Sequence, residues 1–263
     1  FTQEDIKYAE LDNDKVVEIN YTSGTTGFSK GVMLTGNNLA GNVTYARTLD
    51  LLFRGERELC FLPLAHAYSC AFNLLVPMAF GVHVYLLGKV LKAFEEVKPN
   101  LILMVPLILE KIYKKMILPQ LNKRTLKLAL NIPLLDSRIY AQIRKHLVDA
   151  LGGRFREVIV GGAAMNQEVT DFLYKIKFPF TIGYGMTECG PLISYDHNNE
   201  YVPGSCGQIL KGIMKVRIDS EDPYNKVGEI QVSGENVMKG YYKNDEATQN
   251  VFTEDGWLRT GDL

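Results

Sequence analysis

The sequence has few cysteines, no excess of charge of either sign, and no periodic glycine or proline. Its 263 residues contain four cysteines, which form no C-x-x-C pair and lie at no zinc-ligand spacing from one another or from a histidine. We therefore expect free thiols in a reducing compartment and a cytoplasmic location. The formal net charge is −1, so binding to nucleic acid through bulk charge is not expected. Glycine and proline without a repeat exclude a collagen-like chain.

A long charge-free segment has to be considered as a membrane span. Residues 59–88 contain no Asp, Glu, Lys or Arg, and about 20 apolar residues suffice to cross a bilayer. Polar and helix-breaking residues interrupt the segment at Pro63, His66, Asn73, Pro77, Gly81 and His83. A strand, a loop, a helix and a second strand explain this pattern better than one continuous helix, so we predict no transmembrane span. The acidic, polar residues 1–14 also argue against a signal peptide.

Short apolar runs alternate with helical patterns over the first two-thirds of the chain. The pattern predicts strands at Val16–Tyr21, Leu59–Leu62, Val82–Leu87, Leu101–Val105 and Glu157–Val160. It predicts helices at Asn37–Phe53, Ser69–Phe80, Pro106–Ile117 and Ser137–Leu151. This alternation is typical of an α/β fold with mainly parallel sheets covered by helices, in which ligands lie beyond the carboxyl ends of the strands.

The last third of the chain has a different character. Turn pairs such as Pro203-Gly204 separate short β runs at Ile213–Ile218 and Glu229–Val232. We expect a small antiparallel or barrel-like β region at the C-terminal end. The predicted organisation is therefore an α/β core over residues 1–200 and a β-rich subdomain over residues 201–263.

The strongest local signal for function is the glycine- and threonine-rich segment from Tyr21 to Gly31, YTSGTTGFSKG. Glycines allow close backbone approach to an anion, consecutive amides can form a nest for phosphate oxygens, and Lys30 adds a positive charge. The segment fits neither G-x-x-x-x-G-K-[ST] nor G-x-G-x-x-G, so a P-loop, a kinase loop and a Rossmann loop are not supported. We predict polyphosphate binding; the alternative is a flexible polar surface loop.

Three further segments carry weaker signals. In residues 181–188 (TIGYGMTE), Tyr184 lies between glycines and could stack on a planar base, while Glu188 could hold Mg²⁺. The small residues Gly162, Ala163 and Ala164 follow a predicted strand and leave room for a ligand. Asp262 could accept hydrogen bonds from a ribose diol. Each segment alone is equally compatible with a structural turn or close packing.

Taken together, these segments resemble the adenylate-forming superfamily of acyl-CoA synthetases, peptide-synthetase adenylation domains and luciferases. Residues 21–32 (YTSGTTGFSKGV), 183–188 (GYGMTE) and 256–262 (GWLRTGD) match three core motifs of that family. The resemblance extends over essentially the whole chain and is strongest to long-chain fatty acyl-CoA synthetases. It also implies that the chain is the central part of a larger enzyme, without the start of the N-terminal domain and without a C-terminal lid domain that bears a catalytic lysine.

The resemblance implies a role for each matching residue. The β- and γ-phosphates of ATP would be bound by Thr22, Ser23, Gly24, Thr25, Thr26, Gly27 and Lys30. Tyr184 would line the adenine site, opposite a wall formed by Gly162, Ala163 and Ala164. Thr187 would contact the α-phosphate and the carboxylate, Glu188 would ligate Mg²⁺, and Asp262 would hold the ribose hydroxyls. The run from Pro63 to His66 matches the acyl-pocket motif, which would set His66 beside the reacting carboxylate.

The implied reaction joins a carboxylic acid to ATP, forms an acyl-adenylate and then a thioester with coenzyme A. The sequence departs from the family pattern at Phe28-Ser29, where a proline often precedes the lysine, and at Gly36, where a histidine is frequent. Residues 65–71 (AHAYSCA) contain no acid to pair an ammonium group, so amino acid substrates are disfavoured and long-chain fatty acids are favoured. Aryl acids stay open.

Two other functions remain as alternatives. One is a nucleotide-binding module without turnover, because the lid lysine is absent from these residues; on this view the chain alone is expected to be inactive. The other is a phosphotransferase, which lacks support from a Walker lysine or an H-R-D loop. The expected partners are small molecules, with peripheral membrane contact of the whole enzyme and its oligomeric state left open.

Overall fold

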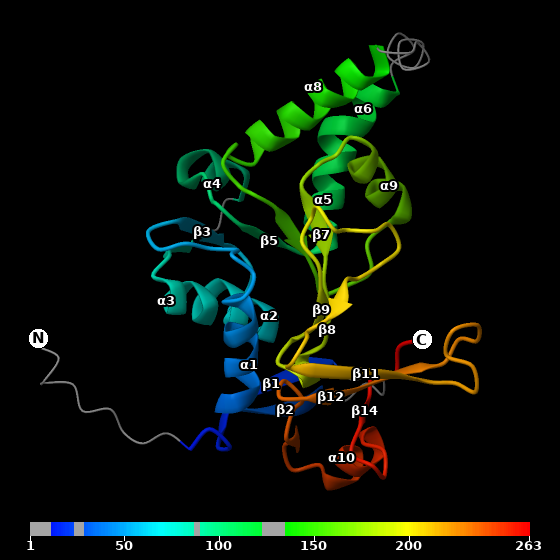
Figure 1. The fold of residues 1–263 in the computed structure, drawn as a ribbon. Coiled ribbons are helices and arrows are strands. Elements are labelled where there is room, and N and C mark those ends of the chain that lie inside the picture. The colour runs from blue at the N-terminus through cyan, green and yellow to red at the C-terminus, as the bar shows by residue number, and fades with distance from the viewer. Residues whose placement is uncertain (1–11, 24–28, 87–89, 123–134) are drawn as a thin grey trace, which may run out of the picture.

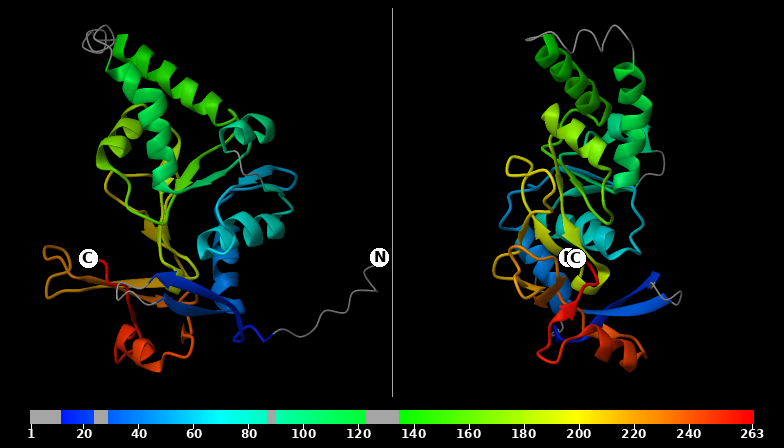
Figure 2. Two further views of the ribbon diagram at one scale, coloured as in Figure 1. Left: turned by 180° about the vertical axis from the view of Figure 1, so that it is seen from behind. Right: turned by 90° about the vertical axis from the view of Figure 1, so that its right-hand side faces the viewer.

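The computed structural model describes residues 12–23, 29–86, 90–122 and 135–263 of the chain. Figure 1 shows two regions: helices packed around parallel strands in the upper part, and antiparallel strands in the lower part. Figure 2 shows the same division from behind and from the side. The expected α/β class, with an additional antiparallel region, is confirmed.

The parallel strands form the centre of the upper region. They are β3 (Arg57–Cys60), β4 (His83–Leu86), β5 (Ile102–Met104), β6 (Val158–Val160) and β7 (Phe180–Ile182). β3 pairs with β4, while β6 pairs with β5 on one side and β7 on the other. A parallel bridge between Glu58 and Leu101 links the two groups. β5 and β6 are buried along their whole length, as continuous apolar runs predict, but β4 is largely exposed.

Helices cover these strands and connect them. The α-helices are α1 (Gly36–Ala46), α2 (Ala67–Ser69), α3 (Val76–Phe80), α4 (Val90–Val97), α5 (Pro106–Ile112), α6 (Leu118–Leu121), α8 (Leu135–Ala150), α9 (Gln167–Lys175) and α10 (Asp245–Val251). The described residues also form two π-helical segments, η2 (Cys70–Leu75) and η3 (Tyr113–Ile117), and a short 3₁₀ turn, η4 (Thr187–Cys189). α2, η2 and α3 follow one another without a break, so the predicted helix at residues 69–80 is confirmed with a wider turn before Pro77.

The antiparallel strands form three further sheets. Their strands are β1 (Val16–Ser23), β2 (Ser29–Thr35), β8 (Tyr184–Gly185), β9 (Leu192–Tyr195), β10 (Gln208–Ile209), β11 (Met214–Asp219), β12 (Glu229–Gly234), β13 (Gly240–Tyr241) and β14 (Leu258–Arg259). The sheet orders are β1-β2-β13, β10-β9-β8 and β11-β12-β14. The described strands do not close into a barrel. Because β13 pairs with β2, the last third of the chain is joined to the N-terminal hairpin.

Two local predictions need correction. The sequence predicted no strand between the phosphate segment and the helix from Asn37, but β2 lies there and pairs with β1, so that Ser23 lies opposite Ser29. Val32 and Leu34 alternate into the core and are fully buried, which is the period-two signal of a strand. The helix predicted at residues 37–53 ends at Ala46, and Asp50 adopts a left-handed backbone conformation that a helix cannot contain.

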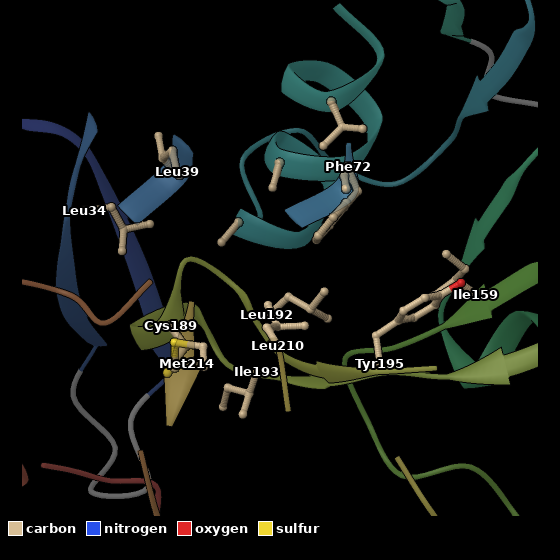
Figure 3. Close-up of a cluster of buried hydrophobic side chains, with 14 of the residues drawn as sticks. Leu34, Leu39, Phe72, Ile159, Cys189, Leu192, Ile193, Tyr195, Leu210 and Met214 are labelled. Carbon is tan, nitrogen blue, oxygen red and sulfur yellow. The ribbon is translucent and has the colours of Figure 1, made fainter. Parts of the chain in front are cut away.

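Apolar side chains form two clusters. One cluster packs α4, α5, α8 and α9 around β5–β7, with Phe94, Leu147 and Leu173 almost fully buried. The other joins the N-terminal hairpin and α1 to the antiparallel sheets, as Figure 3 shows for Leu34 and Leu39 on one side and Ile193 on the other. Residues of both clusters also lie at the ends of the strands that border the candidate site.

Candidate functional site

Two adjoining cavities lie at the carboxyl ends of β6 and β7. The first has a volume of about 470 Å³ and the second about 650 Å³. Both are bordered by Gly162 and by residues 183–185, so they share one wall. Gly162 closely follows β6 and Gly183 directly follows β7. The cavities therefore occupy the position at which open α/β sheets hold ligands.

The second cavity collects residues from three distant segments. Gly162, Ala163, Ala164, Tyr184 and Asp262 all line it. The Tyr184 hydroxyl donates a hydrogen bond of 2.6 Å to Oδ2 of Asp262, across 78 positions of sequence. Burial, followed by the Asp262 carboxylate, raises the pKa of Tyr184, which keeps the phenol a neutral donor. The five residues predicted to surround a nucleoside are thus brought together.

In the shared wall, the backbone at Gly185 packs closely against the backbone at Pro191. A Cβ atom on this residue would lie 2.2 Å from the carbonyl oxygen of Pro191. Only glycine permits so close an approach, which explains the second glycine of the GYG sequence. This contact holds β8 against the segment that leads into β9 and so fixes the turn η4 with Thr187 and Glu188.

The first cavity is mainly apolar. Its lining includes Leu62, Val105, Ile159 and Leu192, together with the polar side chains of His66, Tyr68, Ser69 and Thr187. His66 is exposed and immediately precedes α2, and its ring makes no capping hydrogen bond. The Tyr68 hydroxyl donates to the carbonyl oxygen of Ile159 at 3.2 Å. Such a cavity suits an apolar group whose polar end faces His66 and Thr187.

Lys30 and Glu188 both contact Tyr241, a residue that the sequence did not identify as part of the site. The ammonium nitrogen of Lys30 lies 5.0 Å from the ring centroid of Tyr241. The hydroxyl of Tyr241 donates a 2.9 Å hydrogen bond to Oε1 of Glu188, whose side chain is only 8% exposed. Burial, and after it the Glu188 carboxylate, raises the pKa of Tyr241. The predicted lysine and glutamate therefore lie on the same side of the molecule.

Part of the predicted phosphate segment lies outside the described residues. These positions are Gly24, Thr25, Thr26 and Gly27, and the side chain of Ser23 is also not described. Thr22 stands at the end of β1, directly opposite Lys30 on β2. The described parts thus fix where the segment starts and ends, next to β13 and Tyr241.

Glu188 is the described residue best suited to a hard divalent cation. Its Oε2 accepts no hydrogen bond from a described residue, whereas Oε1 is bonded to Tyr241. Within the described ranges, no three His, Cys, Asp or Glu side chains gather as a metal cluster. Mg²⁺ commonly binds one or two carboxylates together with substrate phosphates and water, so one free carboxylate oxygen beside a phosphate segment fits this ion.

Sequence reasoning missed several residues of the site. Tyr241 lies in a β run that contains no motif. The available signal was its position between Gly240 and a second tyrosine. Tyr68 and Ser69 follow His66 within one helical turn, a spacing that could have identified them as further lining of the first cavity.

Comparisons with known proteins agree with this geometry. A family model described as AMP-binding enzyme matches residues 2–242. The chain is 31% identical over 280 residues to long-chain-fatty-acid–CoA ligase 1 of Saccharomyces cerevisiae, covering 95% of this chain and 40% of the relative. It is also 31% identical to 4-coumarate–CoA ligase of Pinus taeda, over 95% of this chain and 45% of the relative.

A solved structure has the same fold. ATP-bound MatB of Rhodopseudomonas palustris matches with a TM-score of 0.73 and 25% identity, over 96% of this chain and 46% of that protein. The chain thus spans less than half the length of each of these relatives. Among the described helices, none combines the length and the hydropathy that crossing a membrane requires.

Proposed function

The chain belongs to the AMP-binding enzyme family, and from this membership we propose that the protein activates a carboxylic acid with ATP and then transfers the acyl group to coenzyme A. The observation that carries the proposal is the pair of adjoining cavities. The first is mainly apolar and is bordered by Thr187, the second is lined by Asp262, and Tyr184 lies in the wall that they share. An acid in the first and a nucleotide in the second would have their reacting groups next to each other.

The proposed reaction has two steps. An oxygen of the carboxylate attacks the α-phosphorus of ATP, the bond to the bridging oxygen breaks, and pyrophosphate leaves with that electron pair. The sulfur of coenzyme A then attacks the acyl carbon, AMP leaves, and the thiol proton passes to solvent. The first step builds negative charge around phosphorus, so it is accelerated by fixed positive charge and N–H or O–H donors.

The chain contains residues of the kinds that can supply these interactions. Lys30 would bind the β- and γ-phosphates with Thr22 and the segment from Ser23 to Gly27. Thr187 would donate to the α-phosphate or to the carboxylate, and His66 would lie beside that carboxylate. Mg²⁺, held by Glu188, would neutralise phosphate charge. Gly162, Ala163, Ala164 and Tyr184 would enclose the adenine, and Asp262 would accept hydrogen bonds from the ribose.

A long-chain fatty acid is the favoured substrate. The first cavity is mainly apolar, and residues 65–71 offer no carboxylate to an α-ammonium group. An aryl acid is the second candidate, supported by the likeness to the Pinus taeda 4-coumarate–CoA ligase. We assign the reaction to the cytoplasm, because the four cysteines are free.

The test is ATP–pyrophosphate exchange by the complete protein with palmitate, 4-coumarate and phenylalanine. Palmitate should give the fastest exchange; faster exchange with 4-coumarate would favour the aryl acid. ATP binding without exchange for any acid would favour a nucleotide-binding module without turnover.

Two variants test the charged residues of the site. Lys30→Ala and Glu188→Gln should each slow exchange by about 100-fold or more, because each removes charge from the phosphate site. Lys92→Ala and Glu95→Gln on the exposed face of α4 are the matched controls and should exchange at the wild-type rate. Wild-type exchange in the Lys30 and Glu188 variants would show that the site is misassigned.

A further inference from the structure

The segment Met238–Tyr241 connects the strand that carries Lys30 to the turn that carries Glu188. The backbone N–H of Met238 donates to the carbonyl oxygen of Glu188 at 2.7 Å. Three residues later, the Tyr241 hydroxyl donates to Oε1 of the same glutamate. Between these two contacts, the N–H of Lys239 donates to the carbonyl oxygen of Met33 on β2. One short segment thus holds both the backbone and the side chain of Glu188.

Tyr241 is itself fixed from its other side by α10. Its backbone N–H donates to Oγ1 of Thr248 at 2.9 Å. The preceding Gly240 has φ +141°, and a Cβ atom there would lie 2.8 Å from Cγ2 of Thr248. Only glycine permits this approach, so β13 is pressed against α10 at one defined position. Tyr241 is 5% exposed, so its side chain is packed on nearly all sides.

The ring of Tyr241 also separates two opposite charges. Its hydroxyl contacts the Glu188 carboxylate, while its face receives the Lys30 ammonium at 5.0 Å from the centroid. No ion pair joins Lys30 to Glu188 in the part of the chain that the structure describes. A direct ion pair would hold the lysine on the glutamate and occupy the oxygen that a cation requires. A cation–π contact keeps the lysine close without using a carboxylate oxygen.

We propose that Tyr241 is a positioning residue that orients the Glu188 carboxylate, with Oε2 presented to the cation, and keeps Lys30 from pairing with it. This inference rests on the proposed function, because it requires Glu188 to bind the divalent cation of the ATP complex. Tyr241 touches neither ATP nor the acid in this role and acts through Glu188 and Lys30.

The test measures Mn²⁺ binding to the complete protein with ATP by electron paramagnetic resonance. Tyr241→Phe keeps the ring and removes only the hydroxyl, so it should still fold, with a thermal midpoint lowered by the lost hydrogen bond. A hydrogen bond to a charged group is lost, and we expect Mn²⁺ affinity to fall about tenfold. The matched control is Tyr242→Phe, because Tyr242 is the next residue and is 41% exposed; it should bind Mn²⁺ as the wild type does.

A second measurement separates positioning from general damage. ATP binding in EDTA should be the same in Tyr241→Phe and in the wild type, because no metal is then oriented. Equal weakening of ATP binding with and without Mn²⁺ would overturn the inference, since it would indicate a purely structural defect.

Glu188→Gln distinguishes failure of this inference from failure of the proposed function. If Glu188→Gln weakens Mn²⁺ binding and Tyr241→Phe does not, the role of Tyr241 is refuted and the metal assignment stands. If Glu188→Gln itself leaves Mn²⁺ binding unchanged, the metal assignment in the proposed function fails and the role of Tyr241 fails with it.

Discussion

The Asp262 carboxylate borders the second cavity, and its two oxygens differ in their hydrogen bonds. Oδ2 accepts the Tyr184 hydroxyl, whereas Oδ1 receives no hydrogen bond from a described residue. The half-buried phenol therefore acts as a donor that turns the carboxylate, leaving one oxygen for a ligand. A ribose diol has two hydroxyl donors at suitable spacing for such an oxygen.

Replacing Asp262 by alanine should weaken ATP binding by about 10- to 100-fold, because hydrogen bonds to a charged acceptor are lost. Titration with a fluorescent ATP analogue measures the change. Glu254→Ala, at an exposed position of the same segment, is the control and should bind normally. Asp262→Ala should also lose most of the preference for ATP over 2′-deoxy-ATP. An unchanged preference would contradict the ribose assignment.

The sequence predicted which side chains lie at this site better than it predicted the contacts that hold them there. Tyr184 and Asp262 were identified from motifs 78 positions apart, and they are in direct contact. Lys30 and Glu188 were also identified, but the residue between them was not. Tyr241 depends on the pairing of β13 with β2, a long-range contact that no local pattern encodes.

At the scale of elements, buried continuous apolar runs were the easiest to predict. β5 and β6 have only apolar residues because both of their faces are covered, and the sequence located them within one residue. β2 was missed because its glycine and lysine belong to the phosphate motif and obscured the alternation of Val32 and Leu34. The end of α1 was misplaced because apolar residues continue after it, in turns that lead to β3.

Strand β3 carries a buried carboxyl group, Glu58, that no sequence motif indicated. Glu58 on β3 is fully buried, its Oε1 accepts a hydrogen bond from Asn73 of η2, and its Oε2 has no partner among the described residues. Tyr68 and Cys60 are the titratable groups beside it. Burial raises the pKa of Glu58 from 4.5 to about 8, against the weaker opposing effect of the Asn73 hydrogen bond. The carboxyl is therefore protonated in the folded chain at neutral pH.

This shift predicts a pH-dependent free energy of unfolding. Between pH 4.5 and about 8, Glu58 is ionised in the unfolded chain and protonated in the folded chain. The folded state then binds more protons, so stability falls as pH rises, by at most about 1.4 kcal/mol per pH unit, and levels off above the folded pKa. Glu58→Gln should remove this slope, as measured by urea unfolding across that range.

Glu95→Gln on exposed α4 is the control for the Glu58 experiment and should keep the wild-type slope. Comparing the two variants cancels the contributions of all other titrating groups. Identical slopes in wild type and Glu58→Gln would mean that Glu58 is ionised when folded, with a partner that the described residues do not include.

On the scale of the whole molecule, the second cavity lies between the two apolar clusters. Ile182 and Tyr201 belong to or pack against the cluster around β5–β7, while Ile193, Ile209 and Ile230 pack in the other. The two clusters also contribute neighbouring residues of β6, since Ile159 belongs to one and Val160 to the other. A ligand in this cavity would contact both clusters at once, so binding and global stability should be coupled.

ATP should therefore stabilise the whole fold and not only the loops that touch it. For a ligand that binds only the folded state, a concentration of 100 times the dissociation constant adds about 2.7 kcal/mol to the free energy of unfolding. Because the cavity joins both clusters, intrinsic fluorescence of Trp257 and far-ultraviolet circular dichroism should shift to higher urea together. Asp262→Ala should show a smaller shift at the same ATP concentration, because the stabilisation falls with the logarithm of its affinity for ATP. An unfolding curve that saturating ATP leaves unchanged would contradict the nucleotide site, and a shift in only one probe would contradict the coupling of the two clusters.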